Sequence, residues 1–138
     1  MRVFLDTNVI LDYLLAREPF YKDAVILVDL CSNSTFHGII SSLTVVNCFY
    51  ILRKAYPIDI VYDYVNWMIQ AFDVSNIDSQ VIHKAYSAKR DDFEDMVQYY
   101  SALNSNAEVI ITRDKSGFAN GVLSVFNVSE FLAECMKS

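Results

Sequence analysis

Three aspartates in this chain share one kind of position, at the boundary of a predicted strand or helix. Asp6 follows the apolar run in "MRVFLDTNVI", and Asp114 follows a β-branched run in "EVIITRDKSGF". Asp95 lies in "KRDDFEDMVQYYSAL", in the first turn of a predicted helix. Carboxylates that converge from two strand ends and one helix start suit Mg²⁺ or Mn²⁺, which prefer oxygen ligands. Such ions support phosphodiester hydrolysis, because they can activate water and stabilise charge on the departing oxygen.

Each acid also has a simpler explanation that the sequence leaves open. Aspartate is common in polar turns, so Asp6 could begin a turn and Asp114 could be an exposed turn residue. The helix dipole favours acids in the segment 91–95, where Asp91 or Asp92 can cap the predicted helix. The metal hypothesis therefore depends on the acids occurring together at compatible ends of elements.

The elements needed to bring these acids together alternate along the chain. Short β-branched runs predict strands at 2–5, 36–40, 72–74, 108–111 and 124–127. Helical patterns predict helices at 21–31, 43–55, 60–71, 79–88, 93–103 and from 129 to the end. This alternation predicts an α/β fold with a mostly parallel sheet covered on both faces, and ligands then bind beyond the carboxyl ends of the strands.

The predicted helix in "SSLTVVNCFYILRK" carries the remaining polar candidates. Ser42 is its expected cap, and apolar residues occur in nearly every direction around its axis, which predicts a buried helix. Thr44, Asn47 and Lys54 fall along one side and predict a narrow polar seam that faces a site. Asn47 either contributes to that site or is a core amide with satisfied hydrogen bonds.

The composition predicts one soluble domain that spans residues 1–138. Hydrophobic residues make up 54% of the chain, enough for one core, and no apolar run reaches the roughly 18 residues of a membrane helix. The N-terminus lacks the pattern of a secretory signal, so a cytoplasmic location is expected. Cys31, Cys48 and Cys135 lack the paired spacings of zinc sites and are expected to be reduced thiols that serve as small buried apolar groups. The net charge of -6 argues against binding nucleic acid by bulk electrostatics.

Four stretches, in this order and at these separations, resemble the PIN-domain family: "VFLDTNVILD", "SSLTVVNCFYILRK", "DFEDMVQYYSAL" and "VIITRDKSGF". The resemblance covers nearly the whole chain, and within the family the chain is similar to the VapC-type toxin ribonucleases. It implies a three-layer α/β/α sandwich with a central, mostly parallel sheet of about five strands. In the family, acids gathered by this sheet hold Mg²⁺ or Mn²⁺ and cleave RNA. The matching acids here are Asp6, Asp95 and Asp114.

One position departs from the family pattern. Most members have a glutamate where this chain has Asn47. An amide can coordinate through its carbonyl oxygen or orient a water molecule, but it adds no charge. Glu94 and Asp92 are candidates to supply the missing charge, and Asp92 is the better placed of the two because it lies one turn before Asp95.

These motifs predict a metal-dependent endoribonuclease whose ion is held by Asp6, Asp95 and Asp114, with Asn47 positioning a water molecule or a phosphate oxygen. The resemblance further implies a small antitoxin partner that blocks the site, and homodimerisation. The alternative is a catalytically weakened PIN-like module that binds nucleic acid or a protein. Asn47 favours that module, whereas the three retained acids oppose it, since a binding module has no need to gather repelling carboxylates. A DNA or flap nuclease is a third reading, but such enzymes usually need extra substrate-threading segments.

Four cations lie at the ends of these motifs and are candidates to guide backbone phosphates: Arg53, Lys54, Arg113 and Lys115. The alternative is that they are solvated surface charges. Tyr99 and Tyr100 could stack on RNA bases, although tyrosines in so apolar a chain more often serve packing. His37 and His83 have no obvious partners and are expected to be structural or surface residues.

Overall fold

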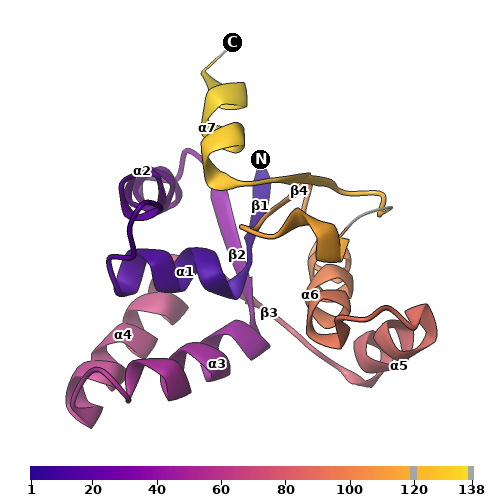
Figure 1. Cartoon of the computed structure of the whole chain (residues 1–138), viewed down its shortest axis with the longest axis horizontal. Coiled ribbons are helices and arrows are strands. Elements are labelled where there is room, and N and C mark those ends of the chain that lie inside the picture. Colours follow the sequence, from indigo (N-terminus) through magenta and orange to yellow (C-terminus); the bar gives the residue numbers. More distant parts are fainter. Residues whose placement is uncertain (119–120, 137–138) are drawn as a thin grey trace.

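The computed structural model describes residues 1–118 and 121–136 and contains a five-stranded sheet. The strands lie in the order β3-β2-β1-β4-β5, and every neighbouring pair is parallel. Their bounds are β1 Arg2–Leu5, β2 His37–Ser41, β3 Asp73–Ser75, β4 Val109–Ile111 and β5 Ser124–Phe126. The first strand of the chain is therefore the central strand of the sheet (Figure 1).

Helices cover both faces of this sheet, which confirms the predicted three-layer α/β/α sandwich. On one face, α5 and α6 pack together with the short 3-10 helix η1, and the remaining α-helices pack on the other face (Figure 1). Their bounds are α1 Thr7–Leu14, α2 Tyr21–Ser32, α3 Ser42–Leu52, α4 Ile58–Ala71, α5 Ser79–Ala88, α6 Phe93–Asn104, η1 Lys115–Phe118 and α7 Val128–Cys135. None of the helices in the described ranges combines the length and the apolar character needed to cross a membrane.

The central strands divide their side chains between two cores. Val3 and Leu5 of β1 join the core shared with α1 to α4 and α7, whereas Phe4 joins the core beneath α5 and α6. β4 alternates in the same way, with Ile110 on the Phe4 side and Ile111 on the other. Both faces of a parallel sheet covered in this way are apolar, so polar side chains first occur where the strands end.

The strand order reverses between β1 and β4, and the two predicted strand-end acids lie at this point. β2 and β3 extend the sheet on one side of β1, while β4 and β5 extend it on the other. Asp6 directly follows β1, and Asp114 lies three residues after the end of β4. Asp95 lies in the first turn of α6. In open α/β sheets, ligands bind in the crevice at such a reversal.

All five predicted strands are present, but the sequence pattern did not predict α1. This helix follows β1 after a single residue, Asp6, and most of its side chains are buried. Its buried residues are Thr7, Val9, Ile10, Leu11, Asp12 and Leu14. The helix has only eight residues and follows an apolar strand directly, and an apolar run this short does not distinguish a helix from a buried strand.

Two predictions about α3 are wrong. Its N-cap is Ser41 rather than Ser42, because the Ser41 hydroxyl accepts a hydrogen bond from the Thr44 amide at 3.1 Å. The helix is also not buried all round, since Val46 is 52% exposed and Tyr50 is 59% exposed. No element described in this chain covers that outer face, so the apolar pattern on α3 includes a face open to solvent.

Two of the three cysteines behave as predicted. Cys31 and Cys48 are free, buried thiols in the core, and Cys135 is half-buried. Burial raises the pKa of Cys48 to about 12 and that of Cys31 to about 11. Thiols with such pKa values stay protonated at neutral pH and are poor nucleophiles and metal ligands. The chemistry of this fold therefore depends on its oxygen groups.

Candidate metal centre

A cleft of about 460 Å³ opens beyond the carboxyl ends of the strands, where the sheet order reverses. Five carboxylates line it: Asp6, Asp92, Glu94, Asp95 and Asp114. Asn47 lines the same cleft, together with Thr7, Asn8 and Tyr50. Lysine, arginine and histidine are absent from the described residues that form its walls, so neither His37 nor His83 belongs to the site. The structure brings the three predicted acids and Asn47 into one cleft of concentrated negative charge.

Asp6 is the most enclosed of these carboxylates, with 6% of its surface exposed. Its Oδ1 accepts hydrogen bonds from the Thr7 amide at 2.8 Å and from Gln98 Nε2 at 3.1 Å. Its Oδ2 accepts a hydrogen bond from Thr112 Oγ1 at 2.8 Å. The donors belong to α1, α6 and the residue after β4, so one carboxylate joins three parts of the chain. These bonds satisfy the acid that the sequence places at the end of a buried strand.

Gln98 is a positioning residue that the sequence pattern did not reveal. It is fully buried, and its Nε2 also donates to Thr44 Oγ1 at 2.9 Å, while its Oε1 accepts from Ser41 Oγ. The hydroxyl oxygens of Thr7 and Thr44 lie 2.8 Å apart and complete the network. Asp6 is therefore held by groups that are themselves fixed. The available signal was a glutamine at a position that the helix buries, where an amide needs polar partners.

Asp95 projects from the first turn of α6 into the crowded part of the cleft. Its backbone amide donates to Oδ1 of Asp92, the N-cap of α6, at 3.0 Å. Burial, followed by the charges of Asp6 and Asp92, raises the pKa of Asp95 to about 7, and the charge of Asp114 adds to the shift. A methyl group placed on Gly117 would lie 1.7 Å from Asp95 Oδ2. The carboxylate occupies its place because residue 117 has no side chain.

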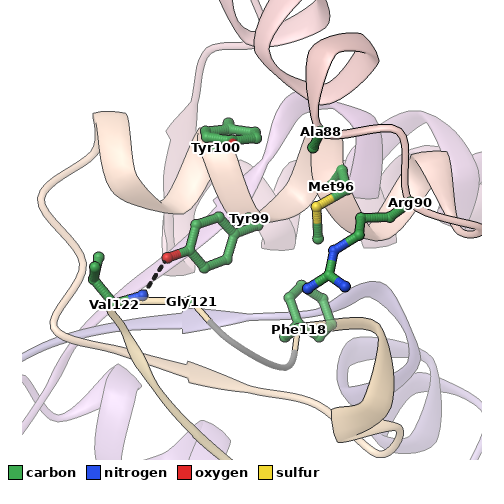
Figure 2. Close-up of a pocket in the computed structure, with 8 residues that line it drawn as sticks. All are labelled: Ala88, Arg90, Met96, Tyr99, Tyr100, Phe118, Gly121 and Val122. Atoms are coloured by element: carbon green, nitrogen blue, oxygen red, sulfur yellow. Dashed lines mark hydrogen bonds between the residues drawn. The ribbon is translucent and has the colours of Figure 1, made fainter.

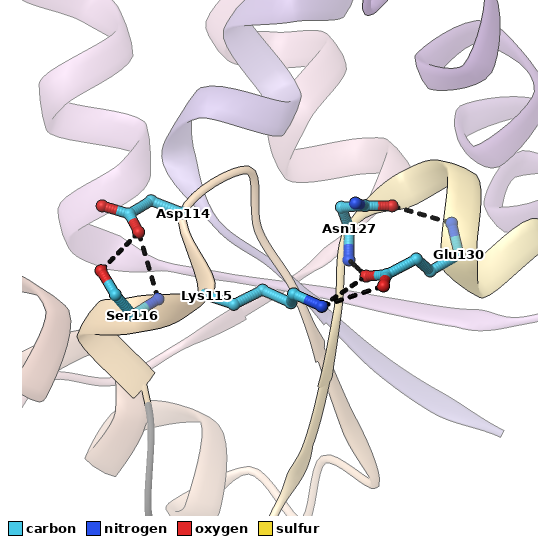
Figure 3. Close-up of polar contacts among 5 residues, drawn as sticks. All are labelled: Asp114, Lys115, Ser116, Asn127 and Glu130. Carbon is cyan, nitrogen blue, oxygen red and sulfur yellow. Dashed lines mark hydrogen bonds and ion pairs between the residues drawn. The ribbon is translucent and has the colours of Figure 1, made fainter.

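Asp114 lies at the exposed side of the cleft and is held by its own turn (Figure 3). Its Oδ1 accepts hydrogen bonds from Ser116 Oγ at 2.6 Å and from the Ser116 amide at 3.1 Å. These bonds to the side chain and backbone of Ser116 hold the pKa of Asp114 below its ordinary value. Asp114 is therefore ionised and oriented by local contacts.

Asn47 and Glu94 meet across the cleft. Asn47 Nδ2 donates to Glu94 Oε1 at 3.4 Å, which joins α3 to the first turn of α6. Burial, then the charges of Asp6 and Asp92, raise the pKa of Glu94 above its ordinary value. Glu94 is thus the carboxylate that touches the position where most of the family has glutamate. Asp92, which its place in the sequence favoured, also lines the cleft but caps α6.

Two of the four predicted phosphate ligands make ion pairs within the protein. Arg113 Nε lies 3.2 Å from Oδ2 of the buried Asp12, and its guanidinium stacks 4.5 Å from the centre of the Phe20 ring. Burial raises the pKa of Asp12, while the charges of Arg113 and Arg17 oppose the rise. Lys115 Nζ lies 2.9 Å from Glu130 Oε1 (Figure 3). Both cations therefore hold the segment that carries Asp114 in place.

Arg53 and Lys54 are exposed after the end of α3. The Arg53 guanidinium lies 6.0 Å from the centre of the Phe49 ring. Neither side chain lines the acidic cleft. Of the predicted polar seam of α3, only Asn47 lines the cleft, while Thr44 belongs to the buried hydrogen-bond network around Gln98. A role for Arg53, Lys54, or the paired cations on the Asp114 segment in binding phosphate stays a prediction.

The oxygen donors of the cleft fit Mg²⁺ or Mn²⁺, but the side chains are not gathered around one point. In residues 1–118 and 121–136, no three acidic, histidine or cysteine side chains are close enough to hold an ion together. Asp6, Asp95 and Asp114 each lie against their own protein contacts. Carboxylates repel one another when no cation separates them, and this repulsion adds to burial, the larger cause, in raising the pKa of Asp95. Their role as metal ligands stays a prediction.

The parallel five-stranded sheet, with an acidic cleft where the strand order reverses, is the architecture expected from the family resemblance of the sequence. A family model described as "PIN domain" matches residues 2–116, which include all three acids and Asn47. The chain belongs to the PIN domain family. No curated protein matches the sequence.

Several solved structures have a similar fold at low sequence identity. FitAcB from Neisseria gonorrhoeae has a TM-score of 0.69 at 18% identity, over 92% of this chain and 98% of that chain. VapBC-1 from nontypeable Haemophilus influenzae has a TM-score of 0.68 at 19% identity, over 94% and 99%. VapC20 from Mycobacterium tuberculosis, described as a sarcin-ricin loop cleaving toxin, has a TM-score of 0.68 at 12% identity, over 86% and 95%. The likeness is one of fold.

Replacement of Gln98 tests the network behind Asp6. Gln98→Leu removes the side-chain donor to Asp6 and Thr44 and the acceptor of the Ser41 hydroxyl, all at a buried position. We expect it to lower the free energy of unfolding by about 2–4 kcal/mol, measured by urea unfolding. Gln70→Leu, at an exposed position on α4, is the control and should change stability by less than about 0.5 kcal/mol. Equal, small effects of the two substitutions would contradict the network.

Removal of the Asp95 charge should change the pH dependence of stability. The pKa of Asp95 is about 7 in the folded protein against an ordinary value of 3.8, so between these values the folded state binds more protons than the unfolded state. The stability of the metal-free protein therefore falls as pH rises through this range. Asp95→Asn should flatten that fall and raise the melting temperature near pH 8, whereas Asp63→Asn, at an exposed position on α4, should not. Thermal melting in EDTA measures both, and identical pH profiles would refute the expectation.

Proposed function

We propose that this protein is a metal-dependent endoribonuclease and the toxin component of a bacterial toxin–antitoxin pair. The observation that carries the proposal is the cleft itself, in which five carboxylates gather beyond the strand ends and no described cation lines the walls. Such a concentration of like charge destabilises the metal-free fold, so it is expected where the charge serves a function. The PIN domain match and the fold shared with VapC and FitAB toxins support the reaction class.

Each cleft residue has a defined task in this proposal. Asp6, Asp95 and Asp114 hold Mg²⁺ or Mn²⁺, and Asp6 is the best fixed of the three because its hydrogen bonds orient both carboxylate oxygens. When bound, the ion activates water and stabilises the charge that develops on the departing oxygen. Asn47 positions a water molecule or a phosphate oxygen through its amide. Glu94, in contact with Asn47, supplies the negative charge that most of the family has at that position.

A small antitoxin is the proposed partner, and homodimerisation is proposed with it. The solved proteins of similar fold include VapBC and FitAcB, and one is described as a toxin–antitoxin complex from Klebsiella pneumoniae. In this chain, large apolar side chains are exposed on α3 and α4: Val46, Tyr50, Ile58, Ile60, Tyr62 and Ile69. An apolar surface of this kind is typical of a protein interface. A cytoplasmic location goes with the proposal, since RNA is the substrate.

Cleavage of RNA by the purified protein tests the reaction. We expect cleavage with Mg²⁺ or Mn²⁺, and no cleavage with EDTA, when fragments of single-stranded and structured RNA are separated on denaturing gels. Asp6→Asn should abolish cleavage, while Asp63→Asn, which removes one negative charge outside the cleft, should cleave at the wild-type rate. Cleavage that persists in EDTA and in Asp6→Asn would contradict the proposal.

The alternative function is a catalytically weakened PIN-like module, and the amide at residue 47 is the observation that favours it. A module of this kind would bind RNA or a protein but would not cleave RNA with any divalent ion. The same purified protein distinguishes the two functions, because binding of RNA without cleavage over a wide range of Mn²⁺ concentrations would support the module and reject the nuclease.

Asn47→Glu tests whether this position faces the ion. A carboxylate here should lower the Mn²⁺ concentration needed for half-maximal cleavage, because it adds a charged ligand. The melting temperature of the metal-free variant should fall, since another negative charge joins Glu94 and Asp6, and added Mn²⁺ should restore it. Asn66→Glu, on the exposed side of α4, is the matched control and should change neither quantity. Equal Mn²⁺ dependence in wild type and Asn47→Glu would remove Asn47 from the site.

A further inference from the structure

A second hollow lies on α6, one helical turn beyond Asp95, and the proposed reaction makes no use of it (Figure 2). Its volume is about 250 Å³. Its walls include the aromatic rings of Tyr99, Tyr100 and Phe118. They also include the Met96 thioether, the main chain at Gly121 and the Arg90 guanidinium. We call it the aromatic hollow.

The aromatic hollow lies near the acidic cleft, and Arg90 connects the two. Arg90 lines the aromatic hollow and also an adjoining hollow of about 310 Å³ that contains Asp92, Asp95 and Asp114. The same three acids line the cleft that holds Asp6. A chain that leaves the acids along this surface therefore passes Arg90 before it reaches the aromatic rings.

One ring of the hollow is fixed and supports the other. The hydroxyl of Tyr99 accepts a hydrogen bond from the Val122 amide at 2.6 Å (Figure 2). The main chain passes so close to this ring that a methyl group on Gly121 would lie 2.3 Å from Tyr99 Cε1. Tyr100 stands edge-on to Tyr99, with ring centres 5.4 Å apart and planes at 84°. Tyr99 is buried and serves packing, whereas Tyr100 is half-buried and keeps surface for a ligand.

We propose that the aromatic hollow binds a base of the RNA strand next to the cleaved bond, and this inference rests on the proposed function. Aromatic faces stack on any nucleobase, because every base has a π-face. Its volume is below the roughly 300 Å³ of a typical small-molecule site, so it suits one ring system rather than a whole nucleotide. Arg90 lies between this base and the acids, where it contacts the connecting phosphate. A base with its phosphate would use both the aromatic rings and the guanidinium that line the hollow, whereas an apolar side chain of a protein partner would use only the rings.

Binding of intact and abasic RNA separates a base contact from a general loss of structure. Asp6→Asn protein in Mg²⁺ at low salt is titrated into two fluorescent RNA decamers with the same backbone, one with bases and one abasic, and anisotropy gives both dissociation constants. Tyr100→Ala should weaken binding of the intact decamer by about 5- to 100-fold and leave the abasic decamer nearly unchanged. Tyr100→Phe keeps the ring and should bind both as the parent does. Tyr21→Ala, on α2, removes a half-buried tyrosine outside the hollow and should also have no effect.

Arg90→Gln provides the second measurement. It should weaken both decamers by the same factor and lower the slope of log Kd against log salt by about one, because it removes a phosphate contact rather than a base contact. The base-binding site is refuted if Tyr100→Ala weakens binding of both decamers equally. It is also refuted if Tyr100→Ala weakens binding of neither, and a protein side chain would then be the occupant of the hollow to test. RNA cleavage by wild-type protein is scored separately. If wild-type protein cleaves RNA but Tyr100→Ala does not selectively weaken binding of the intact decamer, only the base site is rejected. If Tyr100→Ala has this selective effect but the wild type does not cleave RNA, only the nuclease function is rejected.

Discussion

The hydrogen bonds to the buried carboxylate of Asp6 fix the geometry on which the rest of the site depends. The carboxylate ends the central strand of a sheet that is covered on both faces, so water cannot satisfy its oxygens freely. Gln98, Thr112 and the Thr7 amide do so instead, and they come from α6, the β4 end and α1. The need to satisfy one buried charge therefore sets how these elements meet, and it places the two other predicted acids beside the same cleft.

The cleft combines this fixed acid with acids that repel it. Asp95 is half-buried, burial and the charges of Asp6 and Asp92 raise its pKa to about 7, and Gly117 of η1 leaves room for its carboxylate. Asp114 is oriented by Ser116 at the exposed side. The ionised Asp95 is less stable here than a neutral side chain would be, and local rules of stability are commonly broken at functional sites. A divalent ion would reduce the repulsion, which would link the stability of the protein to the ion of the proposed reaction.

Two of the positive charges, those of Arg113 and Lys115, make ion pairs within the protein that hold the segment after β4 in place. Arg113 pairs with the buried Asp12, and Lys115 pairs with Glu130, so this segment is attached to α1 and to α7. The acidic cleft thus stays free of lysine and arginine among the described residues, as a cation site requires. Arg90 lines the aromatic hollow and the surface that leads from the acids to the half-buried ring of Tyr100.

The sequence alone determined the strands, the alternation with helices, the three acids at element ends and the family, because these depend on local periodicity and on short motifs. It did not reveal α1 or the open face of α3, since an apolar run does not state which neighbours will cover it. Gln98 and Glu94 likewise acquire their roles only from contacts across the fold, with Asp6 at 3.1 Å and with Asn47 at 3.4 Å. Hydrogen bonds between residues far apart in the chain leave no periodic signal, so only the tertiary structure decided which side chains fix the acids.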